Sequence, residues 1–103
     1  VAAPKGGEIK VAHESYFELL TEGKTLTVYA YDKDLKPLPD DKLSDISATA
    51  TLPKGKAQVV AVKREGSKLS AEFDSKKSHR FNYTLKFKVH GKDDSVSFNV
   101  EKH

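Results

Sequence analysis

The chain has 103 residues and a net charge of +3, with 37% hydrophobic and 32% charged residues. This length suits one domain with its own hydrophobic core. Cys, Met and Trp are absent, which excludes disulfides, thiol nucleophiles, zinc–thiolate sites and thioether copper ligands. We predict a flexible N-terminal tail over residues 1–6 and a single folded domain over residues 7–103.

Apolar and polar residues alternate with a period of two along most of the chain, which is typical of β-strands with one buried face. Ile9 and Val11 begin the first expected strand. The others are expected at residues 16–21, 25–31, 46–52, 59–62, 69–73, 80–90 and 95–101. Short turn sequences rich in Gly, Pro and Lys separate most of them. The pattern predicts an all-β protein of about seven to eight strands.

The connections between these strands indicate how the sheets are joined. A turn at residues 91–94 makes a hairpin of the last two strands. Residues 32–44 are longer and contain two prolines and four aspartates, which is typical of a crossover between sheets. We therefore predict an immunoglobulin-like antiparallel β-sandwich with a Greek-key connection. A small closed β-barrel is the alternative, because alternation does not distinguish closure from two packed sheets.

Histidine is the one soft-to-borderline metal ligand that this composition leaves. His13 continues the alternation of Ile9 and Val11 and stands beside Glu14, which makes it the best single ligand candidate. His79, in a polar turn, and His90, at the end of a long strand, are further candidates. A copper or zinc site requires these side chains to meet in the fold. The structural alternative is a His13 that is hydrogen-bonded to the backbone.

Two tyrosines and the distribution of charge suggest where a ligand or partner binds. Tyr29 and Tyr31 lie on the face opposite the expected core residues and are candidates for an exposed patch on which sugars or peptides stack. Residues 1–52 carry a net charge of −3 (six lysines, nine acidic residues), and residues 53–103 carry +6 (twelve basic, six acidic). Such a chain can orient on an acidic partner or surface. Arg64 and Arg80 are the only arginines, which argues against nucleic-acid binding.

Motifs of catalysis are missing or incomplete. Gly23-Lys24-Thr25 ends like a phosphate-binding loop, but Glu18 stands where the first glycine of that loop belongs, and a strand follows in place of a helix. Ser78 and His79 are adjacent without a glycine-framed nucleophile elbow. No apolar run approaches the length of about 20 residues that a membrane span needs. We expect neither an enzyme nor a membrane span in this chain.

The first 40 residues resemble a group of small exported bacterial β-sandwich proteins. In that group a Gly-Gly segment opens the first strand, an aromatic-x-Glu-Leu strand follows, and a strand ending in Tyr-x-x-Asp leads to a Lys-Pro turn. The corresponding runs here are GGEIKV (6–11), YFELL (16–20), LTVYAYD (26–32) and KPL (36–38). The resemblance implies a periplasmic or secreted location after removal of a signal peptide, beside heavy-metal efflux components. Members often carry a histidine before Gly-Gly, where this chain has Lys5, and this departure weakens a transferred metal role.

These observations favour a non-catalytic, extracytoplasmic binding module whose partner is an envelope or secreted protein. The alternative is a periplasmic accessory that holds copper or zinc and is linked to efflux. A third hypothesis is carbohydrate binding at Tyr29 and Tyr31. No cofactor is expected apart from the copper or zinc of the second hypothesis.

Overall fold

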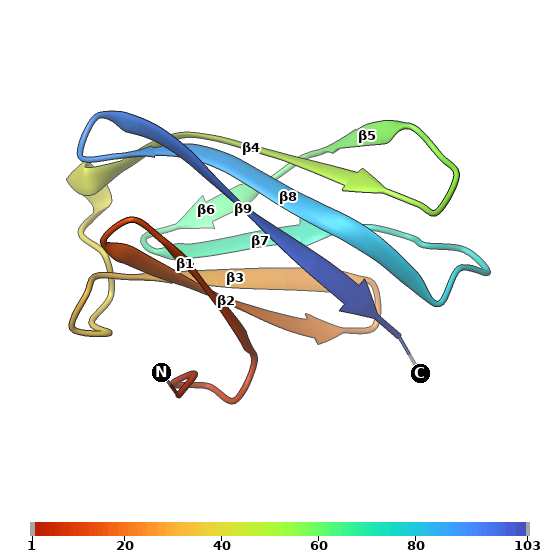
Figure 1. Ribbon diagram of the computed structural model, residues 1–103, viewed down its shortest axis with the longest axis horizontal. Helices are drawn as coiled ribbons and strands as arrows, with labels where there is room; N and C mark the ends of the chain where they lie inside the picture. The colour runs from red at the N-terminus through yellow and green to blue at the C-terminus, as the bar shows by residue number, and fades with distance from the viewer. Residues whose placement is uncertain (1, 103) are drawn as a thin grey trace.

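The computed structural model describes residues 2–102, so Val1 and His103 lie outside the described part. Two antiparallel sheets make up the fold (Figure 1). The five-stranded sheet contains, in spatial order, β1 (Glu8–Ala12), β2 (Ser15–Glu22), β3 (Thr25–Tyr31), β7 (Lys68–Glu72) and β6 (Lys63–Glu65). The four-stranded sheet contains β5 (Ala57–Val60), β4 (Leu43–Thr51), β8 (Arg80–Val89) and β9 (Lys92–Glu101). Residues 2–102 contain one turn of 3₁₀ helix, η1 (Asp40–Lys42), and no helix in this range has the length and apolarity to cross a membrane.

The two sheets pack face to face and bury the residues that the alternation assigns to the core. In β8, Phe81, Tyr83, Leu85 and Phe87 are all buried, as predicted. The Phe17 ring of β2 lies 4.4 Å from the Phe87 ring between centroids, so the two sheets meet through aromatic contacts. The predicted all-β class and sandwich architecture are confirmed, since the sheets are separate in residues 2–102 and do not close into one barrel. The immunoglobulin-like Greek key stays a prediction.

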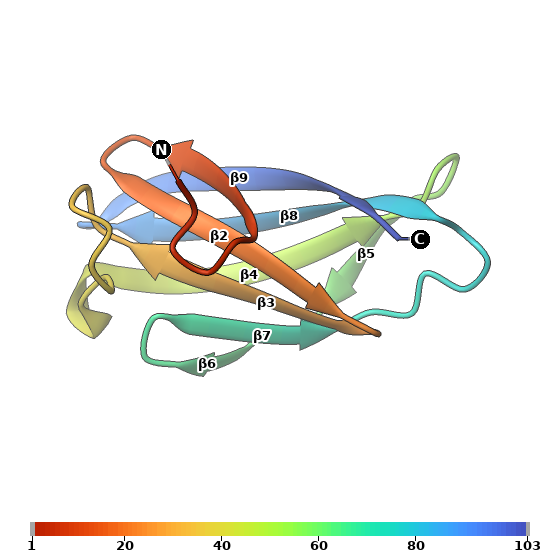
Figure 2. The ribbon, with the colours of Figure 1, turned by 90° about the horizontal axis from the view of Figure 1, so that it is seen from below.

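The chain passes between the sheets at three places. The segment between β3 and β4 crosses over, as its length and prolines predict. The strand expected at residues 59–62 is observed as β5, which ends at Val60 and pairs with β4; β6 was not predicted, and it follows after Ala61 and Val62 and pairs with β7. The last crossing leads from β7 to β8. Strands β5 and β6 are therefore consecutive edge strands, β5 in the four-stranded sheet and β6 in the five-stranded sheet (Figures 1 and 2).

The first strand does not turn its apolar residues Ile9 and Val11 toward the core. The register pairs Ile9 with Glu18 and Val11 with Tyr16, on the outer face of the five-stranded sheet. Val11 is 62% exposed, and Ala12 is the buried residue of this strand. The physical reason is that β1 is an edge strand: its inward residues Glu8 and Lys10 are exposed, so the alternation of apolar residues does not identify the buried face.

Candidate functional site

Two hairpin turns at one end of the sandwich bring together residues that are far apart in sequence. His13 and Glu14 connect β1 to β2, because Ala12 pairs directly with Ser15. His90 and Gly91 connect β8 to β9 in the same two-residue manner. His90 and Gly91 have φ values of 52° and 77°, the left-handed conformation that a tight type I′ turn requires at both positions. The turn predicted at residues 91–94 therefore lies one residue earlier.

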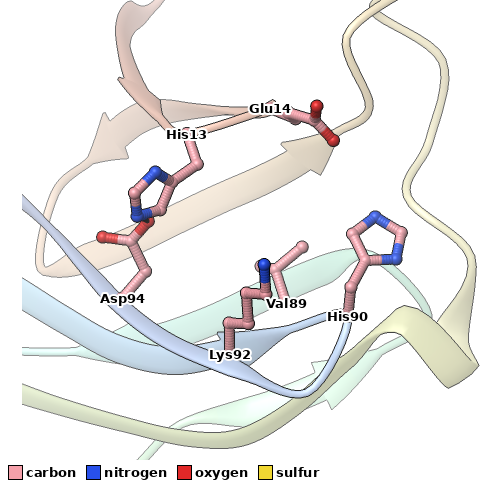
Figure 3. A pocket seen from close by; sticks show the side chains of 6 residues that line it. All are labelled: His13, Glu14, Val89, His90, Lys92 and Asp94. Atoms are coloured by element: carbon pink, nitrogen blue, oxygen red, sulfur yellow. Dashed lines mark ion pairs between the residues drawn. The ribbon is translucent and has the colours of Figure 1, made fainter.

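A cleft of about 310 Å³ separates the two turns (Figure 3) and is lined by His13, Glu14, Val89, His90, Lys92 and Asp94. Nε2 of His13 lies 3.2 Å from Oδ2 of Asp94, and Figure 3 shows these two side chains pointing toward each other. The imidazole is 78% exposed and the carboxylate only 21%. Because His13 belongs to the β1–β2 turn and Asp94 to β9, this pair links the edges of the two sheets.

Three of the four predicted metal-ligand candidates thus lie at one cleft: His13, Glu14 and His90. Asp94 is a fourth residue there with a ligand atom, a carboxylate oxygen. The sequence analysis missed it because residues 91–94 were assigned to a turn. As the side chains stand, no group of three or more His, Asp or Glu residues within residues 2–102 is close enough to hold a metal ion. The Lys92 side chain also lines the cleft and opposes a bound cation electrostatically.

His79 lies elsewhere, in a cleft near the opposite end of the sandwich. Lys24, Asp74, Lys77 and Lys102 line the same cleft. Lys76 N–H donates to Oδ1 of Asp74 at 2.7 Å, and Nζ of Lys24 lies 3.4 Å from Oδ2. The hydrogen bond from the backbone, followed by the Lys24 contact, lowers the pKa of Asp74 below its usual value. His79 and the other three candidates therefore do not belong to one site.

The prediction that Tyr29 and Tyr31 form an exposed patch is wrong. Tyr31 is only 5% exposed, and its hydroxyl donates a 2.7 Å hydrogen bond to Glu18. Burial and the nearby Glu18 carboxylate raise the pKa of Tyr31 well above its ordinary value. Tyr29 is half-buried, with the Nζ of Lys5 at 4.7 Å from its ring centroid. These contacts occupy the tyrosines within the fold, so the carbohydrate-stacking hypothesis loses its surface.

The same contacts give a structural role to the residues on which the family resemblance rests. The fully buried Glu18 carboxylate accepts hydrogen bonds from the N–H groups of Lys5 and Gly7 and from the Tyr31 hydroxyl, at 2.7–3.1 Å. A Cβ added at Gly7 would collide with the carbonyl oxygen of Leu19. Lys5, part of the segment predicted as a flexible tail, is thus hydrogen-bonded to β2. The Gly-Gly and Glu-Leu motifs hold the start of the chain against the sheet.

A second candidate site is the edge formed by β5. Strand β5 pairs with β4 on one side only, and it continues into Ala61 and Val62 before β6. Its residue Val59 is 88% exposed, more than Val11, the other large hydrophobic residue exposed in residues 2–102. We call residues 57–62 the open edge. The sequence signal for it was present, because both alternating positions of this segment are apolar where a half-buried strand has polar residues on one face.

Comparison of the chain with protein-family models, with curated proteins and with solved structures finds no significant match.

Proposed function

We propose that this chain is a non-catalytic binding module of the extracytoplasmic space and that it recognises a protein partner by strand addition at the open edge. The observation that carries the proposal is the 88% exposure of Val59 on a strand that pairs on one side only. The extracytoplasmic location rests on the family resemblance.

The four edge strands of residues 2–102 differ in what they offer to a partner. Strands β1 and β9 pack against each other. Strand β6 consists of the exposed charged residues Lys63, Arg64 and Glu65, and charges on an edge discourage pairing with another strand. Strand β5 has the sequence AQVV and no charge. It presents unpaired backbone groups together with an apolar side chain, and these are the features that strand-addition partners use.

Site-specific photo-crosslinking tests this function directly. A benzoylphenylalanine residue at position 59 is expected to crosslink one protein species in the extracytoplasmic fraction of the source cell. The same residue at position 11 is the matched control, since Val11 is also an exposed valine on an edge strand. Equal crosslinking at both positions, or none at position 59, would contradict recognition through β5.

A second candidate function, handling of copper or zinc, is favoured by the cleft between the two turns. Four side chains with ligand atoms line it, from three separate segments: His13, Glu14, His90 and Asp94. His13 is largely exposed, and rotation about its side-chain torsions changes the position of its nitrogens at little cost. A metal ion would have to displace the His13–Asp94 contact and outweigh the Lys92 charge.

Titration with Zn²⁺ and then Cu²⁺, followed by NMR of the histidine side chains, tests this second function. Saturable shifts at His13 and His90 at micromolar metal are expected, and His13→Ala should abolish them. His79→Ala is the matched control, because His79 lies in a different cleft and its loss should leave the titration unchanged. Absence of saturable shifts at His13 and His90 would remove the metal hypothesis.

A further inference from the structure

The charges around the open edge restrict the kind of partner that fits it. Residues 57–62 are six uncharged residues, with Lys56 immediately before them and Lys63 immediately after. The wider segment 54–65 contains four basic residues and one acidic residue, a net charge of +3. Its lysines, Lys54, Lys56 and Lys63, are exposed and form no ion pair within residues 2–102. Lys56 thus precedes β5, and Lys63 begins β6 after the uncharged residues Ala61 and Val62.

The surroundings of these lysines leave their charge uncompensated. The cleft beside the β4–β5 turn is lined by Lys54, Arg80 and uncharged residues, without a carboxylate. Lys63 shares a cleft with Glu72, but the two form no ion pair. Arg64, in contrast, is used within the fold, because its guanidinium donates to the carbonyl oxygens of Asp40, Leu43 and Gly66. The two flanking lysines are therefore available to a partner.

The same arrangement disfavours a second copy of this chain at the edge. In a centred antiparallel pairing of two open edges, residue 57 faces residue 62 of the other copy, and Lys56 faces its Lys63. This happens at both ends of the pairing. Like charges placed directly opposite each other on paired strands are destabilising, and lysines on an edge are a known obstacle to self-association. Pairing with an extended segment that has acidic residues at its ends is favoured, because each carboxylate of that segment lies opposite a lysine of the open edge.

We propose that the open edge binds an extended segment of another protein, with an uncharged centre of about six residues flanked by acidic residues, and not a second copy of this chain. This inference rests on the proposed function, strand addition at β5, and names its partner class. Alternating apolar side chains on the partner strand would cover Val59 on one face. Glutamate or aspartate residues at its two ends would pair with Lys56 and Lys63.

Two synthetic decapeptides test the inference, each with a Val-Thr alternating centre of six residues. One carries two glutamates at each end, and the other carries two lysines. Their binding is measured by the amide NMR shifts of residues 57–62. We expect the acidic peptide to shift these amides and to bind about tenfold more tightly than the basic peptide, from two exposed charge pairs. Raising the salt concentration to 1 M should reduce the difference, because the charges are exposed.

Charge-reversal variants provide the control. Lys56→Glu combined with Lys63→Glu should reverse the preference between the peptides. Lys33→Glu combined with Lys36→Glu makes the same change in net charge on the exposed β3–β4 crossover and should leave the preference intact. Sedimentation of the wild-type chain should show a monomer at micromolar concentration.

Three other outcomes would each contradict one part of the inference. Equal binding of both peptides at residues 57–62 would refute the acidic partner while leaving strand addition in place. Binding of neither peptide, or shifts elsewhere only, would refute strand addition at β5 itself. A dimer that dissociates on Val59→Lys substitution, and is unaffected by Val11→Lys, would identify a second copy as the occupant and refute the inference.

Discussion

The removal of one hydroxyl group should have opposite effects at two buried tyrosines. Tyr83 is fully buried, and its hydroxyl has no hydrogen-bond partner among residues 2–102. Tyr31 is buried too, but its hydroxyl donates a 2.7 Å hydrogen bond to the Glu18 carboxylate. Tyr83→Phe should therefore raise the free energy of unfolding, whereas Tyr31→Phe should lower it.

The size of each effect follows from the environment of the hydroxyl. A buried polar group without a partner costs about 1–3 kcal/mol, and Tyr83→Phe removes this cost without removing the ring from the core. A hydrogen bond to a charged group contributes about 1.5–3 kcal/mol, which Tyr31→Phe loses. In a domain of this length about 1 kcal/mol changes the melting temperature by roughly 4–8 °C. The two variants should thus melt on opposite sides of the wild-type protein.

Urea denaturation at pH 7, followed by far-ultraviolet circular dichroism, measures both free energies. Circular dichroism is used in place of tryptophan fluorescence because the chain has no tryptophan. A decrease in stability for Tyr83→Phe would show that the Tyr83 hydroxyl has a partner in solution, such as a bound water molecule, and would refute the argument. Unchanged stability for Tyr31→Phe would show that the Glu18 carboxylate gains nothing from that donor.

Three further predictions concern the same fold. Gly7→Ala should lower the free energy of unfolding by about 1–3 kcal/mol in urea denaturation, because the new Cβ collides with the Leu19 carbonyl; an unchanged value would contradict the packing of the N-terminal segment on β2. Phe87→Asp should abolish the cooperative thermal transition, whereas Asn82→Asp, at an exposed position on the opposite face, should cost within about 0.5 kcal/mol; equal losses would mean that the two faces of β8 are interchanged. Burial raises the pKa of Tyr83 to about 12 from an ordinary 10, which favours the neutral hydroxyl in the folded state. The free energy of unfolding should therefore keep its full value below pH 10 and decrease as the pH rises toward 12, by up to about 1.4 kcal/mol per pH unit. Urea denaturation repeated across this pH range should show a smaller decrease for Tyr83→Phe.

The sequence alone was sufficient for the fold class, and β8 with β9 shows why. Their alternation is long and regular, and in both strands one face is buried in the core while the other faces solvent. The crossover between β3 and β4 was also predictable, because two prolines in a polar segment do not support a hairpin. These features depend on local periodicity and turn chemistry, which the sequence carries directly.

The edge strands β1 and β5 were less predictable. Ile9 and Val11 look like core residues in sequence, yet they lie on the outer face, since only the position of β1 at the rim decides which face is buried. The segment at residues 59–62 looks like one buried strand, yet β5 ends at Val60 and the chain crosses to the other sheet before β6 begins at Lys63. Alternation reports that a strand has two different faces, but it does not report which neighbours those faces meet.

The candidate sites depended most on tertiary structure. The sequence by itself determined which ligand types exist, namely histidine and carboxylate without thiols, and it placed lysines on both sides of an uncharged segment. Only the tertiary structure decided that His13, Glu14 and His90 share a cleft with Asp94 while His79 lies apart. It also decided that the Tyr31 hydroxyl donates a hydrogen bond to Glu18 and that β5 pairs with another strand on one side only. The physical reason is that side-chain convergence and strand pairing arise from contacts between distant segments, which are set by the order of strands in the sheets and not by any local pattern.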